Sequence, residues 1–239
     1  SMLYDFKEDP KTTPDIDMFM RSWKESLPRA THGSLIERDV FTKGDPLRPP
    51  TRGAVLKYAN RYVHAVLQPK NVTTPVTLSG EQEVFYIISG TGTMTAGKKT
   101  ADLHAGVAVL MPPGLPYTMK AAGTVPLEMY IMAEPIPAGF RPNKDMLVRD
   151  ENTISYTSDN AHWIGAVKSL FTTADGLGTM ESILTCQFGP NTFFHPHSHV
   201  DGTEEVWSGI YDPAYVLFGR RIRVQDPTTS YLIPTDART

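Results

Sequence analysis

The sequence has little cysteine, no charge bias and no long apolar run. Its single cysteine, Cys186, cannot form a disulfide within the chain and is too little for a cysteine-ligated zinc site. Lysine and arginine total 23 against 26 acidic residues, and the basic residues are scattered, so no patch is present of the kind that binds nucleic acid or an anionic membrane. No apolar stretch could span a bilayer, and the amino end as given carries no signal peptide. We therefore expect a cytoplasmic protein whose partner is a small molecule.

Histidine is concentrated in one short stretch, where three of the seven histidines occupy alternate positions: His195, His197 and His199. In an extended strand residues two apart share a face, so the three imidazoles can converge on one point. Asp201-Gly202 predicts a hairpin turn, and the returning strand brings Glu204 and Glu205 back beside them. Imidazoles with a carboxylate and no thiolate suit one divalent transition metal, such as iron, manganese, nickel, copper or zinc. An exposed polar loop is the alternative, but apolar strand-like segments flank the run.

Residues 1–52 are polar and contain several prolines. Thr13-Pro14-Asp15 offers a helix cap, and apolar residues recur at helical spacing from Ile16 to Leu27. We expect an amino-terminal arm with one short helix. Its apolar stripe is expected to be a packing surface rather than a ligand site.

From Val55 onward the chain consists of short β-rich runs separated by glycine, proline and asparagine. Their even spacing favours an all-β sandwich or barrel. The first series of predicted strands is Tyr62–Leu67, Val84–Ile88, Ala108–Met111 and Leu127–Met132. The second series is Trp163–Val167, Ser182–Phe188, Val206–Ile210, Ala214–Phe218 and Ser230–Ile233.

The two series are copies of one another at an offset of 122 residues. The matching segments are Glu83-Val84-Phe85 with Glu205-Val206-Trp207, Gly97-Lys98-Lys99 with Gly219-Arg220-Arg221, and Val109–Pro112 with Tyr231–Pro234. One constant offset across three separate matches indicates a duplicated β-domain. We place the first copy at residues 53–135 and the second at residues 136–239.

Short motifs in both copies resemble those of the cupin superfamily. The residues that carry the likeness are Glu83, Gly90, Gly106, Pro112 and Gly114 in the first copy, and His197, His199 and Glu205 in the second. The resemblance implies a bicupin, with two antiparallel jelly-roll barrels in tandem. It says little about the reaction, since cupins include dioxygenases, decarboxylases, isomerases, hydrolases, lyases and non-catalytic binding proteins.

The first copy departs from the metal-binding form of the family. The positions of the two early histidines fall around Val76 to Leu78, and Tyr117 stands in place of the histidine of the second motif, which leaves only Glu83. We therefore expect a metal-free barrel, either a scaffold or a pocket that binds a ligand without metal. His64 and His104 also lie in this half, and we expect them to be packed or surface histidines.

The second copy keeps the first motif, but the histidine of its second motif would fall at or beyond Thr239. The strand equivalent to Leu127–Met132 would fall there too, so a carboxyl-terminal strand of this barrel is apparently missing. Either a further tail or another segment has to cover the open sheet edge. We expect the segment Ser34–Phe41 to add to a barrel edge, within the chain or across a homodimer.

Strand parity decides which carboxylate accompanies the histidines, because Glu204 and Glu205 point to opposite sides of a strand. The repeat aligns Glu205 with Glu83, so we predict that His197, His199 and Glu205 bind the metal. His195 is then a further ligand or a group beside the site, and Glu204 a turn residue that could also line it. We expect four aromatic residues to pack in the core or to line the pocket: Phe193, Phe194, Trp207 and Tyr215.

Two histidines and one carboxylate leave open coordination positions, as metal catalysis requires. The sequence therefore favours a metal-dependent bicupin enzyme that acts on a small organic acid or aromatic compound, of the dioxygenase or decarboxylase type. The alternative is a non-catalytic bicupin that binds or senses a small ligand.

Overall fold

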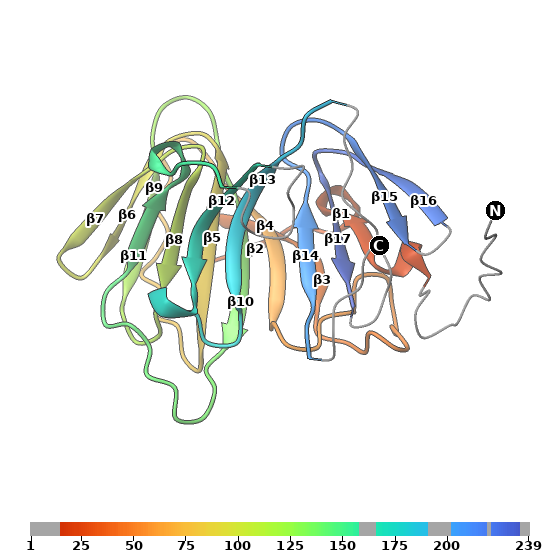
Figure 1. Ribbon diagram of the computed structural model, residues 1–239. Helices are drawn as coiled ribbons and strands as arrows, with labels where there is room; N and C mark the ends of the chain where they lie inside the picture. The colour runs from red at the N-terminus through yellow and green to blue at the C-terminus, as the bar shows by residue number, and fades with distance from the viewer. Residues whose placement is uncertain (1–14, 158–165, 191–201, 219–220, 235–239) are drawn as a thin grey trace, which may run out of the picture. The chain divides into compact units, whose positions relative to one another are not determined.

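The computed structural model describes residues 15–157, 166–190, 202–218 and 221–234 (Figure 1). In this part of the chain the regular elements are β-strands, apart from four single-turn 3-10 helices. The chain forms two compact units. The large unit comprises Ser26–Asp39 and Tyr58–Phe194, and the small unit comprises Ser1–Glu25, Val40–Lys57 and His195–Thr239. Residues 136–157 and 166–190, which the sequence analysis placed in the second copy, thus belong to the large unit.

The large unit contains two antiparallel sheets that enclose one apolar core (Figure 1). The larger sheet has seven strands in the order β11-β8-β5-β10-β4-β3-β2, and the smaller has the order β7-β6-β9. The seven are β2 (Arg29–Thr31), β3 (Leu35–Thr42), β4 (Arg61–Leu67), β5 (Glu81–Ser89), β8 (Val107–Met111), β10 (Leu127–Pro135) and β11 (Leu147–Asp150). The three are β6 (Gly92–Ala96), β7 (Lys99–Leu103) and β9 (Tyr117–Ala121). The segment Ser34–Phe41, expected to cover the open sheet edge of the second copy, instead forms most of β3, which lies beside β4 in the seven-stranded sheet.

Both faces of the seven-stranded sheet are covered. In β5, Phe85 and Ile87 lie in the core between the sheets, whereas Val84 and Tyr86 face the other way, as the two-residue period of a strand requires. That second face packs against β12 (Ala166–Thr172), which pairs with β13 (Ser182–Gln187). Coverage on both sides explains why β8 is apolar at every position, including those that alternate away from the main core.

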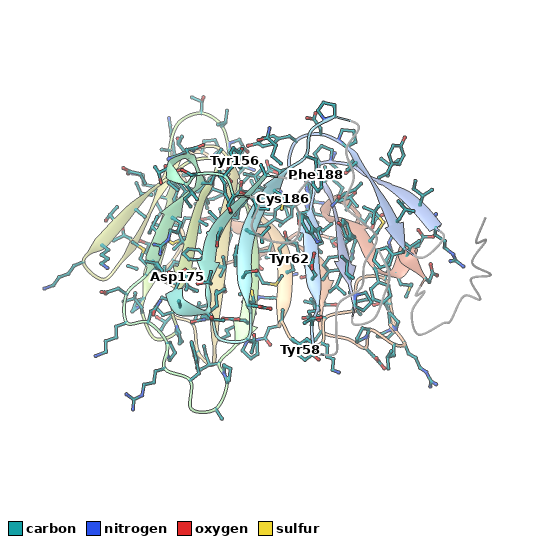
Figure 2. The ribbon with its side chains drawn as sticks, in the orientation of Figure 1. Tyr58, Tyr62, Tyr156, Asp175, Cys186 and Phe188 are labelled. Atoms are coloured by element: carbon teal, nitrogen blue, oxygen red, sulfur yellow. The ribbon has the colours of Figure 1, made fainter. Side chains whose placement is uncertain are left out.

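Glu134, at the end of β10, is fully buried and holds the segment Leu177–Met180 in place. Its carboxylate accepts hydrogen bonds from the backbone N–H groups of Gly178, Thr179 and Met180, at 2.6, 3.0 and 2.6 Å, and from the Thr179 hydroxyl. Gln82 Nε2 donates a further bond of 2.6 Å. Just before this segment, Asp175 at the end of η4 (Thr173–Asp175) pairs with Arg149 at 2.9 Å (Figure 2). The buried carboxylate therefore acts as an anchor for backbone donors that have no strand partner.

The repeat at 122 residues recurs in the strands and in their register. The second-copy strands are β14 (Glu205–Ser208), β15 (Ala214–Phe218), β16 (Arg221–Gln225) and β17 (Thr229–Ile233). Glu205 lies opposite Ile233 as Glu83 lies opposite Met111, with both members displaced by the same offset. The β15–β16 hairpin likewise has the register of the β6–β7 hairpin. These four strands therefore pair in the same register as their counterparts 122 residues earlier.

The predicted amino-terminal helix is wrong. The segment instead contains η1 (Ile16–Met18), β1 (Met20–Ser22) and η2 (Trp23–Glu25). Asp15 does cap η1, since its side chain accepts a hydrogen bond of 3.1 Å from the Asp17 N–H. However, η1 is a single 3-10 turn and does not continue as an α-helix. A helix this short is only marginally stable by itself, so pairing of β1 with β17 outweighs the helical spacing of the apolar residues.

The strand β1 takes the place in the small unit that β11 takes in the large one. It lies on the free side of β17, in the order β1-β17-β14, as β11 lies on the free side of β8. Met20 faces Tyr231, and Val148 faces the equivalent residue Val109. A segment from the amino end of the chain thus covers a sheet edge of the second copy.

Replacing Phe19 by alanine should destabilise the small unit, because this residue is 1% exposed and its ring contacts Phe218 at a centroid distance of 6.3 Å. We expect a loss of about 3–5 kcal/mol, the usual cost of removing a buried phenylalanine. Leu27, from the same predicted helical stripe, is 89% exposed, so Leu27→Ala should change stability by less than about 0.5 kcal/mol. Urea denaturation tests both variants, and equal midpoints would show that the segment does not pack as described.

Candidate functional site

Glu205 opens β14 and lies on the same face of the strand as Trp207, two residues on. The Trp207 indole stacks on Tyr231 with ring centroids 6.5 Å apart, and Phe218 meets Tyr231 edge-on at 6.2 Å. The indole N–H of Trp207 donates to Glu205 Oε1. The carboxylate therefore lies on the aromatic face of this strand, held by a neighbour on the same face.

Glu204 has a different environment. Its Oε2 accepts a hydrogen bond of 2.8 Å from the backbone N–H of Lys57, and it precedes β14. The two neighbouring carboxylates are thus engaged by different groups. The three histidines of residues 195–199 lie outside the described residues, so their convergence with Glu205 stays a prediction.

Of the four aromatic residues expected in the core or in the pocket lining, the structure describes Trp207 and Tyr215. Trp207 is partly buried and contacts Glu205, whereas Tyr215 is 73% exposed. The interpretation of Tyr215 as a core or lining residue is therefore wrong, because it lies on the outward face of its hairpin. Phe193 and Phe194 lie outside the part of the chain that the structure describes.

In the large unit, three of the four positions that the cupin resemblance singled out belong to one apolar core. Val76 and Tyr117 exchange two backbone hydrogen bonds of 2.8 Å each. Both belong to the central core, together with Leu78, and the charge of Glu83 acts on the Tyr117 phenol. The four positions thus carry two aliphatic side chains, a phenol and one carboxylate.

The cation beside Glu83 is a guanidinium. Arg61, at the start of β4, bonds Glu83 Oε1 through Nη2 at 2.9 Å. The same guanidinium binds Glu81 with two bonds, of 2.9 and 2.8 Å, and Asn60 Nδ2 donates to Glu81 at 3.0 Å. Sequence analysis missed Arg61. The sequence does contain a signal for it. Arg61 lies two and four residues before the core residues Val63 and Ala65, and residues two apart share a face of a strand.

Proton affinities in this cluster differ sharply between the two neighbouring acids. Burial raises the pKa of Glu83 to about 7, with the charges of Glu37 and Glu81 adding to the effect and Arg61 opposing it. Burial also acts to raise the pKa of Glu81, but hydrogen bonds from Arg61 and Asn60 outweigh it and leave that pKa lowered. Burial acts to lower the pKa of Arg61, but the hydrogen bond to Glu81 and the charges of Glu83 and Glu81 outweigh it and leave that pKa raised. Burial, followed by the charge of Glu83, raises the pKa of Tyr117. Glu83 is therefore the group that exchanges a proton near neutral pH.

Stability should depend on pH through Glu83. Between its ordinary pKa of 4.5 and about 7, folded protein holds a proton that the unfolded chain has lost, so the free energy of unfolding falls as pH rises. The difference is on the order of 3 kcal/mol across that window. Glu83→Gln cannot ionise and should remove this slope, as measured by urea denaturation from pH 5 to pH 8.

Glu81→Gln is the matched control, because the pKa of Glu81 is lowered. The ionised Glu81 carboxylate stabilises the folded protein above the pKa that Glu81 has in the unfolded chain, and this stabilisation is lost only as pH falls through its lower pKa in the folded protein. Glu81→Gln should therefore be less stable than wild type at neutral pH, and its free energy of unfolding should still fall between pH 5 and pH 8 as that of wild type does. Stability curves of Glu83→Gln and wild type that run parallel would contradict the assignment.

His64 and His104 are engaged in local pairs. His64 is 1% exposed, and its Nε2 lies 2.6 Å from Glu128. His104 is at the surface, with Nε2 3.2 Å from Asp150. His64 also lies edge-on to Tyr130, which stacks on Tyr62 of β4 at 5.2 Å (Figure 2). The expectation of packed or surface histidines is confirmed for both.

Among the described residues, no group of three or more histidine, cysteine, aspartate or glutamate side chains has the arrangement of a metal site. That set leaves out residues 191–201 and hence the three clustered histidines. In the same part of the chain, no helix is long and apolar enough to cross a bilayer.

Comparison with known proteins agrees with this architecture. Residues 63–133, from β4 to β10 of the large unit, match the family model for the cupin domain. No match was found among curated proteins.

Several solved structures are similar to the chain over most of its length. The putative glyoxylate-induced protein of Pseudomonas aeruginosa has a TM-score of 0.71 at 11% identity, covering 94% of this chain and 85% of that one. The formate complex of Lactobacillus farciminis oxalate decarboxylase has a TM-score of 0.67 at 14% identity, covering 92% and 80%. Bacillus subtilis oxalate decarboxylase, in a structure concerned with its Mn(II) centres, has a TM-score of 0.69 at 12% identity, covering 98% and 79%. At these identities the likeness establishes a cupin-like, all-β fold and no activity.

Proposed function

We propose that the chain is a bicupin enzyme whose small unit binds one divalent transition metal through His197, His199 and Glu205. It would act on a small organic acid or aromatic compound, with chemistry of the dioxygenase or decarboxylase type. The observation that carries the proposal is the place of Glu205. It lies on the aromatic face of β14, in the register that Glu83 has in the segment matched by the cupin model.

The donor set fits a metal in the small unit and not in the large one. Glu205 Oε1 accepts a hydrogen bond from the indole N–H of Trp207. The carboxylate still has a second oxygen and further lone pairs with which to coordinate a metal ion. Two imidazoles and a carboxylate suit manganese or iron and leave positions for substrate. In the large unit Glu83 is paired with Arg61, and the other three positions lack imidazole. A metal bound in the small unit would supply Lewis acidity toward a substrate carboxylate or carbonyl.

The residues of the chain would contribute orientation and an apolar surface. Trp207 fixes the Glu205 carboxylate by donating its indole N–H, and such second contacts to a ligand usually tune metal affinity. The stacked rings of Trp207 and Tyr231 offer a flat apolar surface that suits an aromatic or small organic ligand more than a polymer. Mn-containing oxalate decarboxylase among the similar structures supports a carboxylate substrate as the first class to examine.

Metal analysis of the purified protein tests the proposal. We expect about one manganese or iron ion per chain, lost to a chelator and restored by adding back a single metal. The restored protein should then be screened for oxygen uptake and carbon dioxide release with small organic acids and aromatic compounds. Protein that binds no transition metal, or binds two ions per chain, would contradict the assignment of one site to the small unit.

A non-catalytic function in ligand binding is the second candidate, and the polar cluster of the large unit favours it. Tyr117 belongs to the apolar core, and the charge of the Arg61–Glu83 pair acts on its phenol, with the pKa of Glu83 raised to about 7. Such groups could fix a small polar ligand without metal. Calorimetric titration of metal-free protein with the same compounds separates the two candidates, because binding that survives chelation and is lost in Arg61→Met belongs to the large unit.

A further inference from the structure

The β15–β16 hairpin of the small unit exposes an apolar face. Tyr215 is 73% exposed, Leu217 48%, Ile222 52% and Val224 56%. Tyr215 lies directly opposite Val224, and Leu217 directly opposite Ile222. Because these cross-strand pairs are neighbours on one side of the hairpin, the four side chains form one continuous surface, which we call the hairpin face.

The internal repeat provides a control for this surface. At the equivalent positions the β6–β7 hairpin carries Thr93, Thr95, Thr100 and Asp102. These side chains are exposed or half-buried, and the hydroxyls of Thr95 and Thr100 are hydrogen-bonded across the strands at 3.1 Å. The same hairpin, in the same register, therefore forms with a polar outer face. The apolar residues of the second copy are not required by the fold.

The opposite side of the β15–β16 hairpin is already covered. Val216 and Phe218 are 5% and 0% exposed. Arg223, which alternates with the apolar residues of β16, is turned to Asp17 with bonds of 2.9 and 3.1 Å. The charged groups of β16 thus leave the hairpin face free of charge, and an isolated two-stranded hairpin gains stability when its second face is also buried.

We propose that the hairpin face is the contact between two copies of this chain, related by a two-fold axis. A two-fold contact requires a surface that is complementary to itself, and four apolar side chains without a charge meet that condition. A head-to-tail contact with the first copy's hairpin would bury Thr95, Thr100 and Asp102 against apolar groups at a cost in desolvation. A contact of the hairpin face with its own copy avoids this cost.

The size of the surface fits the centre of such an interface. Four large side chains exposed by half to three quarters supply on the order of 400 Å². A stable dimer buries about 800 Å² on each partner, with an apolar centre and a polar rim. The hairpin face is then about half of the contact, and neighbouring surface supplies the rim.

Grafting the first copy's residues onto the second tests this proposal. Light scattering should give a dimer for wild type and half that mass for the fourfold variant Tyr215→Thr, Leu217→Thr, Ile222→Thr and Val224→Asp. Circular dichroism and metal content should remain those of wild type, since the β6–β7 hairpin folds with these residues. Wild type that is monomeric at all concentrations, or a variant that dimerises as wild type does, would overturn the proposal.

Chemical cross-linking gives a second test that does not depend on destabilising the protein. In a Cys186→Ser background, Leu217→Cys should form covalent dimers with a short bis-maleimide. Thr95→Cys, at the equivalent position of the first copy, should remain monomeric under the same conditions. Equal cross-linking at both positions would show that the reagent joins chains without regard to the hairpin face, and none at Leu217→Cys would show that two copies do not meet there. Either result would overturn the proposal.

Discussion

Replacing Glu205 by glutamine is expected to lower the metal content from about one ion per chain to almost none, because a neutral amide is a poor ligand for a hard divalent ion. Glu204→Gln should keep the metal, since the oxygen that accepts from the Lys57 N–H serves the backbone. Trp207→Phe removes the indole donor to Glu205 and keeps an aromatic ring. We expect it to weaken metal affinity by about 10- to 100-fold. Elemental analysis after dialysis against a weak chelator measures all three variants.

The histidine variants complete the test. His197→Ala and His199→Ala should lose the metal as Glu205→Gln does, while His195→Ala distinguishes a ligand from a neighbouring group. His104→Ala is the control, because that surface histidine pairs with Asp150. A Glu204→Gln variant without metal beside a Glu205→Gln variant that keeps it would show that the loop after His199 reverses the parity. Retention of the metal by all of these variants would place it elsewhere.

The second large effect is expected from Glu134→Ala. This change removes a fully buried carboxylate that accepts from the backbone N–H groups of the segment Gly178–Met180. A hydrogen bond to a charged group contributes about 1.5–3 kcal/mol, and because the donor residues are themselves only partly buried or exposed, we expect the large unit to lose about 3 kcal/mol of stability in total. Glu134→Gln keeps the shape but offers one acceptor oxygen and a competing NH₂ group, and its effect should lie between those of wild type and alanine.

Urea denaturation at constant pH measures the effect of the Glu134 variants. Glu181→Ala is the control, since that carboxylate lies just beyond the anchored segment and is exposed, and its effect should stay within about 0.5 kcal/mol. A similarly small loss for Glu134→Ala would mean that water or another side chain satisfies the three donors. Proteolysis at residues 177–181 should accelerate in Glu134→Ala alone if the anchor holds this segment.

Local pattern predicted several of the strands and the repeat at 122 residues, but it left out β6, β7, β9, β11 and β16. The predicted strand Ala214–Phe218 has the bounds of β15, and Leu127–Met132 lies within β10. The same reasoning assigned a helix to Ile16–Leu27, where three apolar residues at helical spacing are in fact buried by a short strand and its flanking turns.

By itself, the sequence determined what depends on short-range order: an all-β chain, a repeat of 122 residues, and a histidine cluster next to paired glutamates. Only the tertiary structure decided which segment lies beside which strand. It placed β1 against β17, Arg61 against Glu83 and Glu134 against the segment Gly178–Met180. These contacts join residues 20 or more positions apart, and their energy depends on burial and on the groups left unsatisfied by neighbouring strands. No local periodicity carries that information.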